Sequence, residues 1–148
     1  MSTNKHLIIG VGSPFGDDRA GWRVIEQLQL MTLPTQLTLK SLDRPGPELI
    51  EQMQGFDRVT LIDAVRAQGY PVGTCLSLDL NQLMQQDSCS SHGFGLAHTL
   101  ALARALGQLP PRLQLWGICI DDRLTGESVS KEVIAAARHL AQRLSGLA

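Results

Sequence analysis

Short apolar runs alternate along the chain with segments in which apolar residues recur every three or four positions. The runs have the length and composition of buried strands, and we predict strands at 6–12, 37–41, 58–64 and 113–120. The recurrent spacing predicts amphipathic helices at 19–30, 95–106 and 129–144. A further short helix is expected from Pro47 to Met53, because proline fits the first turn of a helix.

This alternation of strands and helices predicts right-handed crossovers and a twisted, mostly parallel sheet of about five strands with helices on both faces. The segment 74–78 alternates like a strand but follows its predecessor through a loop too short for a helical crossover, so we expect it to be antiparallel. A length of 148 residues fits one domain. We therefore predict a single three-layer α/β domain over residues 1–148.

Composition and charge exclude several classes of partner. The net charge is −1, from 13 Lys and Arg against 14 Asp and Glu, and only 4% of residues are aromatic, which argues against a nucleic-acid surface. No apolar run has the length of a membrane span, and the N-terminal residues lack a signal-peptide pattern. The three cysteines form no CxxC pair. We expect a cytoplasmic protein with no nucleic-acid or membrane partner.

Acidic residues follow the predicted strands. Asp17 and Asp18 come after the first strand, Asp43 follows the second, and Asp63 ends the third. A polar loop before the helix at 95–106 contains His92. Ligands bind open α/β sheets beyond the carboxyl ends of the strands, so we expect these side chains to converge on one edge.

The glycine-rich loop after the first strand does not predict nucleotide binding. Gly10, Gly12 and Gly16 have GxGxxxG spacing rather than the GxGxxG of dinucleotide-binding loops. Asp17 and Asp18 stand where the next helix begins, and their charges would compete with a phosphate for the free N–H groups there.

Carboxylates and an imidazole from separate loops suit a divalent cation. Asp18, Asp63 and His92 offer oxygen and nitrogen ligands of the kind that zinc and nickel accept. The alternative is that Asp17 or Asp18 only caps a helix, which is a common use of aspartate. Neither a GxSxG nor an HExxH motif is present, so the frequent serine-hydrolase and zinc-protease signatures are absent from the sequence.

An ordered set of short motifs, which spans nearly the whole chain, resembles a known family. The pieces are Gly10-Val11-Gly12-Ser13-Pro14, Gly16-Asp17-Asp18 with Gly21, Asp43, Leu61-Ile62-Asp63-Ala64, Ser91-His92 with Gly95-Leu96, Trp116-Gly117-Ile118 and Ser130-Lys131-Glu132-Val133. In this order they are similar to the hydrogenase maturation endopeptidases, which process the large-subunit precursor of [NiFe]-hydrogenases. The chain departs from the family at Ser13, where asparagine is usual, at Asp18, where some members have glutamate, and at 43–46, where Asp-Gly-Gly-Thr is usual.

The resemblance implies an activity and a set of site residues. The family's three metal-contacting positions match Asp18, Asp63 and His92, and a further sensitive acid matches Asp43. Such an enzyme has no catalytic metal of its own: it recognises nickel already inserted in the precursor and then removes a C-terminal extension. Asp18 or Asp63 as general base, or polarisation by the nickel, would each fit the hydrolysis. We also expect Asp17 and Asp43 to contact the substrate.

Two other functions remain open from the sequence. The chain could bind a metalloenzyme precursor as a docking factor without cleaving it, and would then leave the mass of its partner unchanged. It could also be an autonomous hydrolase that holds zinc between the same three residues, and would then lose activity on chelation.

Overall fold

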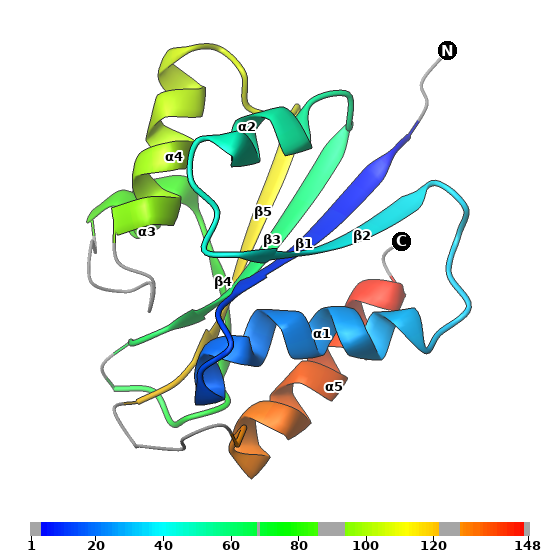
Figure 1. The fold of residues 1–148 in the computed structure, drawn as a ribbon, viewed down its shortest axis with the longest axis vertical. Coiled ribbons are helices and arrows are strands. Elements are labelled where there is room, and N and C mark those ends of the chain that lie inside the picture. Colours follow the sequence, from blue (N-terminus) through cyan, green and yellow to red (C-terminus); the bar gives the residue numbers. More distant parts are fainter. Residues whose placement is uncertain (1–3, 68, 86–93, 122–127, 147–148) are drawn as a thin grey trace.

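The computed structural model describes residues 4–67, 69–85, 94–121 and 128–146 and contains a five-stranded sheet with strand order β2-β1-β3-β5-β4. Strands β1, β2, β3 and β5 are parallel, and β4 runs antiparallel to β5 (Figure 1). Their bounds are β1 His6–Gly12, β2 Leu37–Asp43, β3 Arg58–Val65, β4 Cys75–Leu78 and β5 Arg112–Cys119. The predicted mostly parallel α/β sheet and its antiparallel segment are confirmed.

Helices cover both faces of this sheet and make it the middle of three layers (Figure 1). One face carries α1 (Ala20–Gln29), which follows the 3-10 turn η1 (Gly16–Arg19), together with α5 (Lys131–Ser145). The other face carries α2 (Glu48–Met53), α3 (Leu80–Gln85) and α4 (Phe94–Ala105). Among the helices described, none is both long and apolar enough to cross a membrane.

Alternating strand residues build two separate cores. Ile8 and Ile62 point to α1 and α5, whereas Leu7, Ile9 and Leu61 point to the helices of the opposite face. All five side chains are at most 1% exposed, as expected for a parallel sheet buried on both sides. Strand β1 is therefore a nearly continuous apolar run, whereas the edge strand β2, with the sequence Leu-Thr-Leu-Lys-Ser-Leu-Asp, alternates apolar and polar residues.

One helix and several element boundaries differ from the predictions. Helix α3 was not expected, because its sequence Leu-Asn-Gln-Leu-Met-Gln is too short to show a helical repeat of apolar residues. It has a capping box in which Asp79 Oδ1 accepts from Gln82 N at 2.6 Å and Gln82 Oε1 accepts from Asp79 N at 2.9 Å, a signal that the sequence carried. The last helix starts at Lys131 rather than at residue 129, because Ser130 has an extended backbone.

Helix α1 lies unusually close to strand β1 at two glycines. A Cβ atom on Gly10 would lie 2.3 Å from the carbonyl oxygen of Gly21. A Cβ atom on Gly21 would lie 2.5 Å from the oxygen of Ile62 and 2.6 Å from that of Val11. Only hydrogen atoms fit at these positions, so the two glycines fix how the start of α1 sits on the sheet.

We predict that Gly21→Ala lowers the free energy of unfolding by about 3 kcal/mol or more, since the new methyl group would meet backbone rather than a flexible side chain. Gly46→Ala is the control, because its Cβ would meet only the Glu48 carboxylate, at 3.1 Å. Urea unfolding of both variants measures the difference. Equal losses of stability would contradict the close-packing argument.

A buried histidine makes stability depend on pH. His6 Nε2 is hydrogen-bonded to Thr60 Oγ1 at 2.9 Å, and burial, aided by the charge of Arg58, lowers the pKa of His6 to about 4. Between pH 4 and pH 6.5, which is the ordinary pKa of histidine, the unfolded chain binds a proton at this residue and the folded chain does not. This group therefore contributes stability above pH 6.5 that is lost as the pH falls towards 4.

We expect the wild-type protein to lose up to about 3 kcal/mol more stability than His6→Gln between pH 7 and pH 4. The amide of the variant can still bond Thr60 but does not titrate. Denaturant unfolding at several pH values gives the comparison, in which the shared carboxylate contributions cancel. Parallel pH profiles would show that His6 is not the group responsible.

Candidate functional site

The carboxyl ends of β2, β1 and β3 lie side by side, and two predicted acids stand on the strands that flank β1. Asp43 is the last residue of β2 and is paired in register with Gly12. On the other side of β1, Ile62 is the register partner of Gly10, so Asp63 lies one residue further along β3. This strand order brings three strand ends to one edge of the sheet, and the convergence of the acids into one site stays a prediction.

Asp63 is a buried carboxylate near the end of β3. Its side chain is 2% exposed, and Oδ1 accepts a hydrogen bond from Ala64 N at 2.8 Å. Asp63 is two residues beyond Leu61 on the same strand, so it faces the side covered by α2, α3 and α4. The strand continues to Val65, one residue beyond the predicted end at 64, so Asp63 lies within the strand and two residues before its end.

Asp18 lies in η1, between β1 and α1, and is only partly buried. Its Oδ2 accepts from Ser13 Oγ at 3.1 Å, and its carbonyl oxygen accepts from Ser13 N at 3.3 Å. Asp18 N donates to Phe15 O at 3.0 Å and closes the 3-10 turn. Ser13 thus helps to hold the Asp18 carboxylate in the loop that follows β1.

Asp17 has a different environment from its neighbour. Its side chain is 6% exposed, and both of its oxygens accept hydrogen bonds from Ser130: Oδ1 from the backbone N at 2.7 Å and Oδ2 from Oγ at 3.0 Å. Sequence reasoning missed this partner, because 113 residues separate the two and no local pattern connects them. The contact with substrate expected for Asp17 remains a prediction that must account for these bonds.

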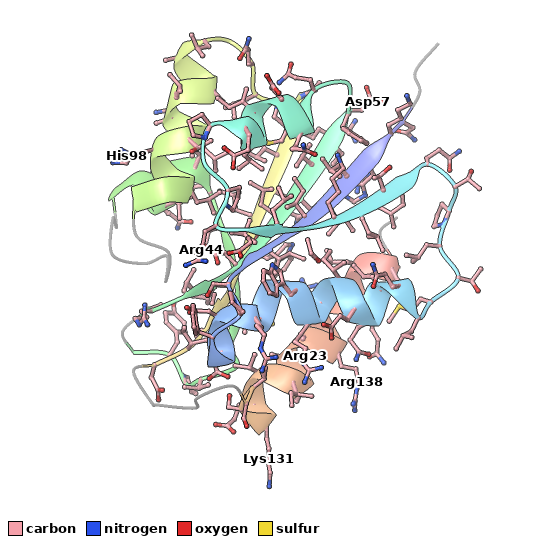
Figure 2. All side chains as sticks on the ribbon, in the orientation of Figure 1. Arg23, Arg44, Asp57, His98, Lys131 and Arg138 are labelled. Atoms are coloured by element: carbon pink, nitrogen blue, oxygen red, sulfur yellow. The ribbon has the colours of Figure 1, made fainter. Side chains whose placement is uncertain are left out.

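Asp43 lies on the surface. Its Oδ1 accepts from Arg44 Nε at 2.8 Å, and both side chains are at least half exposed, so this ion pair contributes little to stability. Arg44 N also donates to Gly12 O at 2.9 Å, which ties the end of β2 to the loop after β1. Figure 2 shows the Arg44 side chain at this end of β2.

The glycine at position 12 is explained by protein packing. A Cβ there would lie 2.8 Å from Trp22 Nε1 and 2.9 Å from the carbonyl oxygen of Asp18. Trp22 Nε1 donates to Leu42 O at 3.0 Å and links α1 to β2. Position 12 therefore requires glycine because a side chain there would collide with the Trp22 indole, and no bound phosphate is needed to explain this glycine.

The third member of the predicted metal-contacting set, His92, lies outside the described residues. Within the part of the chain that the structure describes, no three His, Cys, Asp or Glu side chains cluster as metal ligands. His98 of α4 is exposed and points away from the sheet (Figure 2). Asp18 and Asp63 are thus placed on neighbouring elements at one sheet edge, and the metal-contacting set as a whole stays a prediction.

Comparisons with known proteins agree with this architecture. Residues 22–146 match the family model described as hydrogenase maturation protease, a segment that contains positions 43, 63 and 92 and begins after the aspartates of η1. The hydrogenase 2 maturation protease of Escherichia coli K12 is 30% identical over 116 residues, which cover 76% of this chain and 71% of that protein.

Solved structures share the fold over nearly the full length. The hydrogenase maturating endopeptidase HybD of Escherichia coli superposes with a TM-score of 0.82 at 24% identity, covering 97% of this chain and 91% of that one. The solution structure of an endopeptidase from Escherichia coli gives 0.78 at 27% identity, covering 96% and 94%. Because the family model matches most of the length of this chain, the chain belongs to the hydrogenase maturation protease family.

Proposed function

We propose that this chain is an endopeptidase that removes the C-terminal extension of a [NiFe]-hydrogenase large-subunit precursor after nickel has been inserted. The observation that carries the proposal is membership of a maturation protease family, in a fold that gathers carboxylates at the ends of neighbouring strands. We expect the reaction to take place in the cytoplasm.

Nickel enters this proposal as part of the substrate. A nickel ion held by thiolates of the precursor can accept further oxygen and nitrogen contacts, for which Asp18, Asp63 and His92 are the candidates. A precursor that carries the metal would then bind more tightly than one without it. Such differential affinity makes cleavage conditional on metal loading.

Hydrolysis of the extension needs a group that takes a proton from water as the water attacks the scissile carbonyl carbon. The proton is then delivered to the amine that leaves as the peptide C–N bond breaks. Asp18 and Asp63 are both candidates, and exposure favours Asp18, because it is partly open to solvent whereas Asp63 is 2% exposed. We assign to the buried Asp63 contact with the metal of the substrate and the orientation of the groups that react.

Turnover distinguishes this proposal from a docking function. We expect one equivalent of the protein to shorten many equivalents of a nickel-loaded cognate precursor, with loss of a C-terminal peptide seen by intact mass. A docking factor would form a stoichiometric complex and leave the mass of the precursor unchanged. An autonomous zinc hydrolase would instead bind zinc tightly in isolation and cleave small peptides until chelated.

We predict that Asp18→Asn, Asp63→Asn and His92→Ala each lower kcat/KM for the precursor by about 100-fold or more, since each removes a carboxylate or an imidazole from the proposed reaction. The control is Asp57→Asn, which makes the same charge change at the opposite end of the sheet, where Figure 2 labels Asp57. Unimpaired cleavage by both aspartate variants would exclude a carboxylate base.

Asp43 is expected to act in binding rather than in chemistry, because it is exposed and paired with Arg44. We predict that Asp43→Asn raises KM for the precursor by about threefold to tenfold, with kcat changed less than twofold, as for loss of one rim charge. Steady-state cleavage with Asp57→Asn as the charge-matched control provides the test. A fall in kcat at constant KM would contradict the binding role.

A further inference from the structure

The two adjacent aspartates of η1 are held by different parts of the molecule. Asp17 accepts two hydrogen bonds from Ser130, at 2.7 and 3.0 Å, whereas Asp18 Oδ2 accepts from Ser13 Oγ at 3.1 Å. A 3-10 turn rotates the chain by about 120° per residue, so consecutive side chains diverge. One acid is thereby directed to α5, and the other to the loop that follows β1.

Ser130 is used in an unusual way at its helix terminus. It is the residue before α5 and has the extended backbone of an N-cap, with φ −66° and ψ 154°, yet it makes no side-chain cap bond to its own helix. A serine at this position ordinarily accepts from the second or third helical N–H. Here its hydroxyl donates to Asp17 instead, and its backbone N–H donates to the other carboxylate oxygen.

The Asp17 carboxylate is well stabilised at this place. It lies at the N-terminus of a 15-residue helix, where the helix dipole favours a negative charge. Helix α5 is itself fixed by apolar side chains that pack against α1 and the sheet, among them Val133, Ala137 and Leu140, each at most 1% exposed. The acid thus connects η1 to a rigid element.

Asp18 is held between two anchors. Asp17, which precedes it, is tied to α5 by its hydrogen bonds with Ser130. Gly21, three residues after Asp18, fits against the backbone of β1 and β3 with no space for a methyl group. Consecutive Cα atoms are only about 3.8 Å apart, so movement of Asp17 displaces Asp18 directly. Misplacement of a reacting group by about 1 Å can cost about 100-fold in rate.

We propose that Asp17 is a positioning residue, with Ser130 as its partner, which fixes Asp18 for the reaction and does not itself contact the precursor. The inference rests on the proposed function and replaces the substrate contact expected for Asp17. The rate of cleavage then depends on the hydrogen bonds that residue 17 makes with Ser130. At position 18 the rate depends on the carboxylate itself.

Three variants separate geometry from charge. Asp17→Asn keeps an acceptor for Ser130 N and a polar group opposite its hydroxyl, Asp17→Ala removes both contacts, and Ser130→Ala removes only the hydroxyl. We expect Asp17→Ala to lower kcat for the precursor by about tenfold or more with KM within about twofold, and Asp17→Asn to retain at least about a third of kcat. Ser130→Ala should fall between them.

A variant at the other end of the sheet controls for slower cleavage that results only from a loss of stability. Thr60→Val removes the buried bond to His6 and should cost about 1 kcal/mol without touching the site. At a temperature at which all variants are folded by circular dichroism, this variant should cleave at the wild-type rate. The inference is overturned if Asp17→Ala is no slower than Thr60→Val, or if Asp17→Asn raises KM as strongly as Asp17→Ala does, which would place the carboxylate on the substrate.

Hydrogen exchange tests the same inference without any cleavage. Ser130 N donates to Asp17, and Asp18 N donates to Phe15 O in η1, so these amides report on the anchor. We expect both to exchange faster in Asp17→Ala than in Asp17→Asn, relative to amides of β3. Unchanged exchange in Asp17→Ala would refute the anchor even if cleavage fell. Failure of the wild-type protein to cleave any precursor would refute the proposed function but leave this result standing.

Discussion

The contact between Gly21 at the start of α1 and Gly10 on β1 is the constraint on which the rest of the site depends. Backbone meets backbone there, with no space for a Cβ on either residue. This close contact between α1 and β1 fixes the course of the chain from the end of β1 through η1, and it thereby fixes the positions of Asp17 and Asp18. With a larger residue at either position, α1 would have to lift from the sheet and take η1 with it.

Around this contact the carboxylates are graded by exposure, and the grading suggests how they divide the work. Asp63 is enclosed between the sheet and the helices of one face, Asp17 is buried against Ser130 on the other, Asp18 is partly open, and Asp43 is on the surface. Under the proposed function, these positions would provide an outer contact for the partner, an accessible acid for chemistry and inner groups that hold the geometry. One residue type would serve each purpose because its surroundings differ.

The sequence predicted what local patterns encode and missed what distant contacts decide. Apolar runs such as 58–64 identified the buried strands, and the short loop before residue 74 revealed the antiparallel strand, since chain geometry leaves few alternatives. Helix α3 was missed because its six residues are too few to show a helical repeat, although Asp79 and Gln82 form a capping box. The Asp17–Ser130 bonds could not be predicted at all, because they depend on how α5 docks after 113 intervening residues. The motif order indicated the family, whose model and relatives confirm it.

The most direct test of the account compares one precursor in two states. A cognate [NiFe]-hydrogenase large-subunit precursor, folded in both cases, is incubated with the wild-type protein before and after nickel loading, and its intact mass is followed over time. The account predicts loss of a C-terminal peptide from the nickel-loaded form and no change in the nickel-free form. Equal cleavage of both forms would contradict recognition through the metal, and no cleavage of a verified nickel-loaded precursor would contradict the proposed protease function.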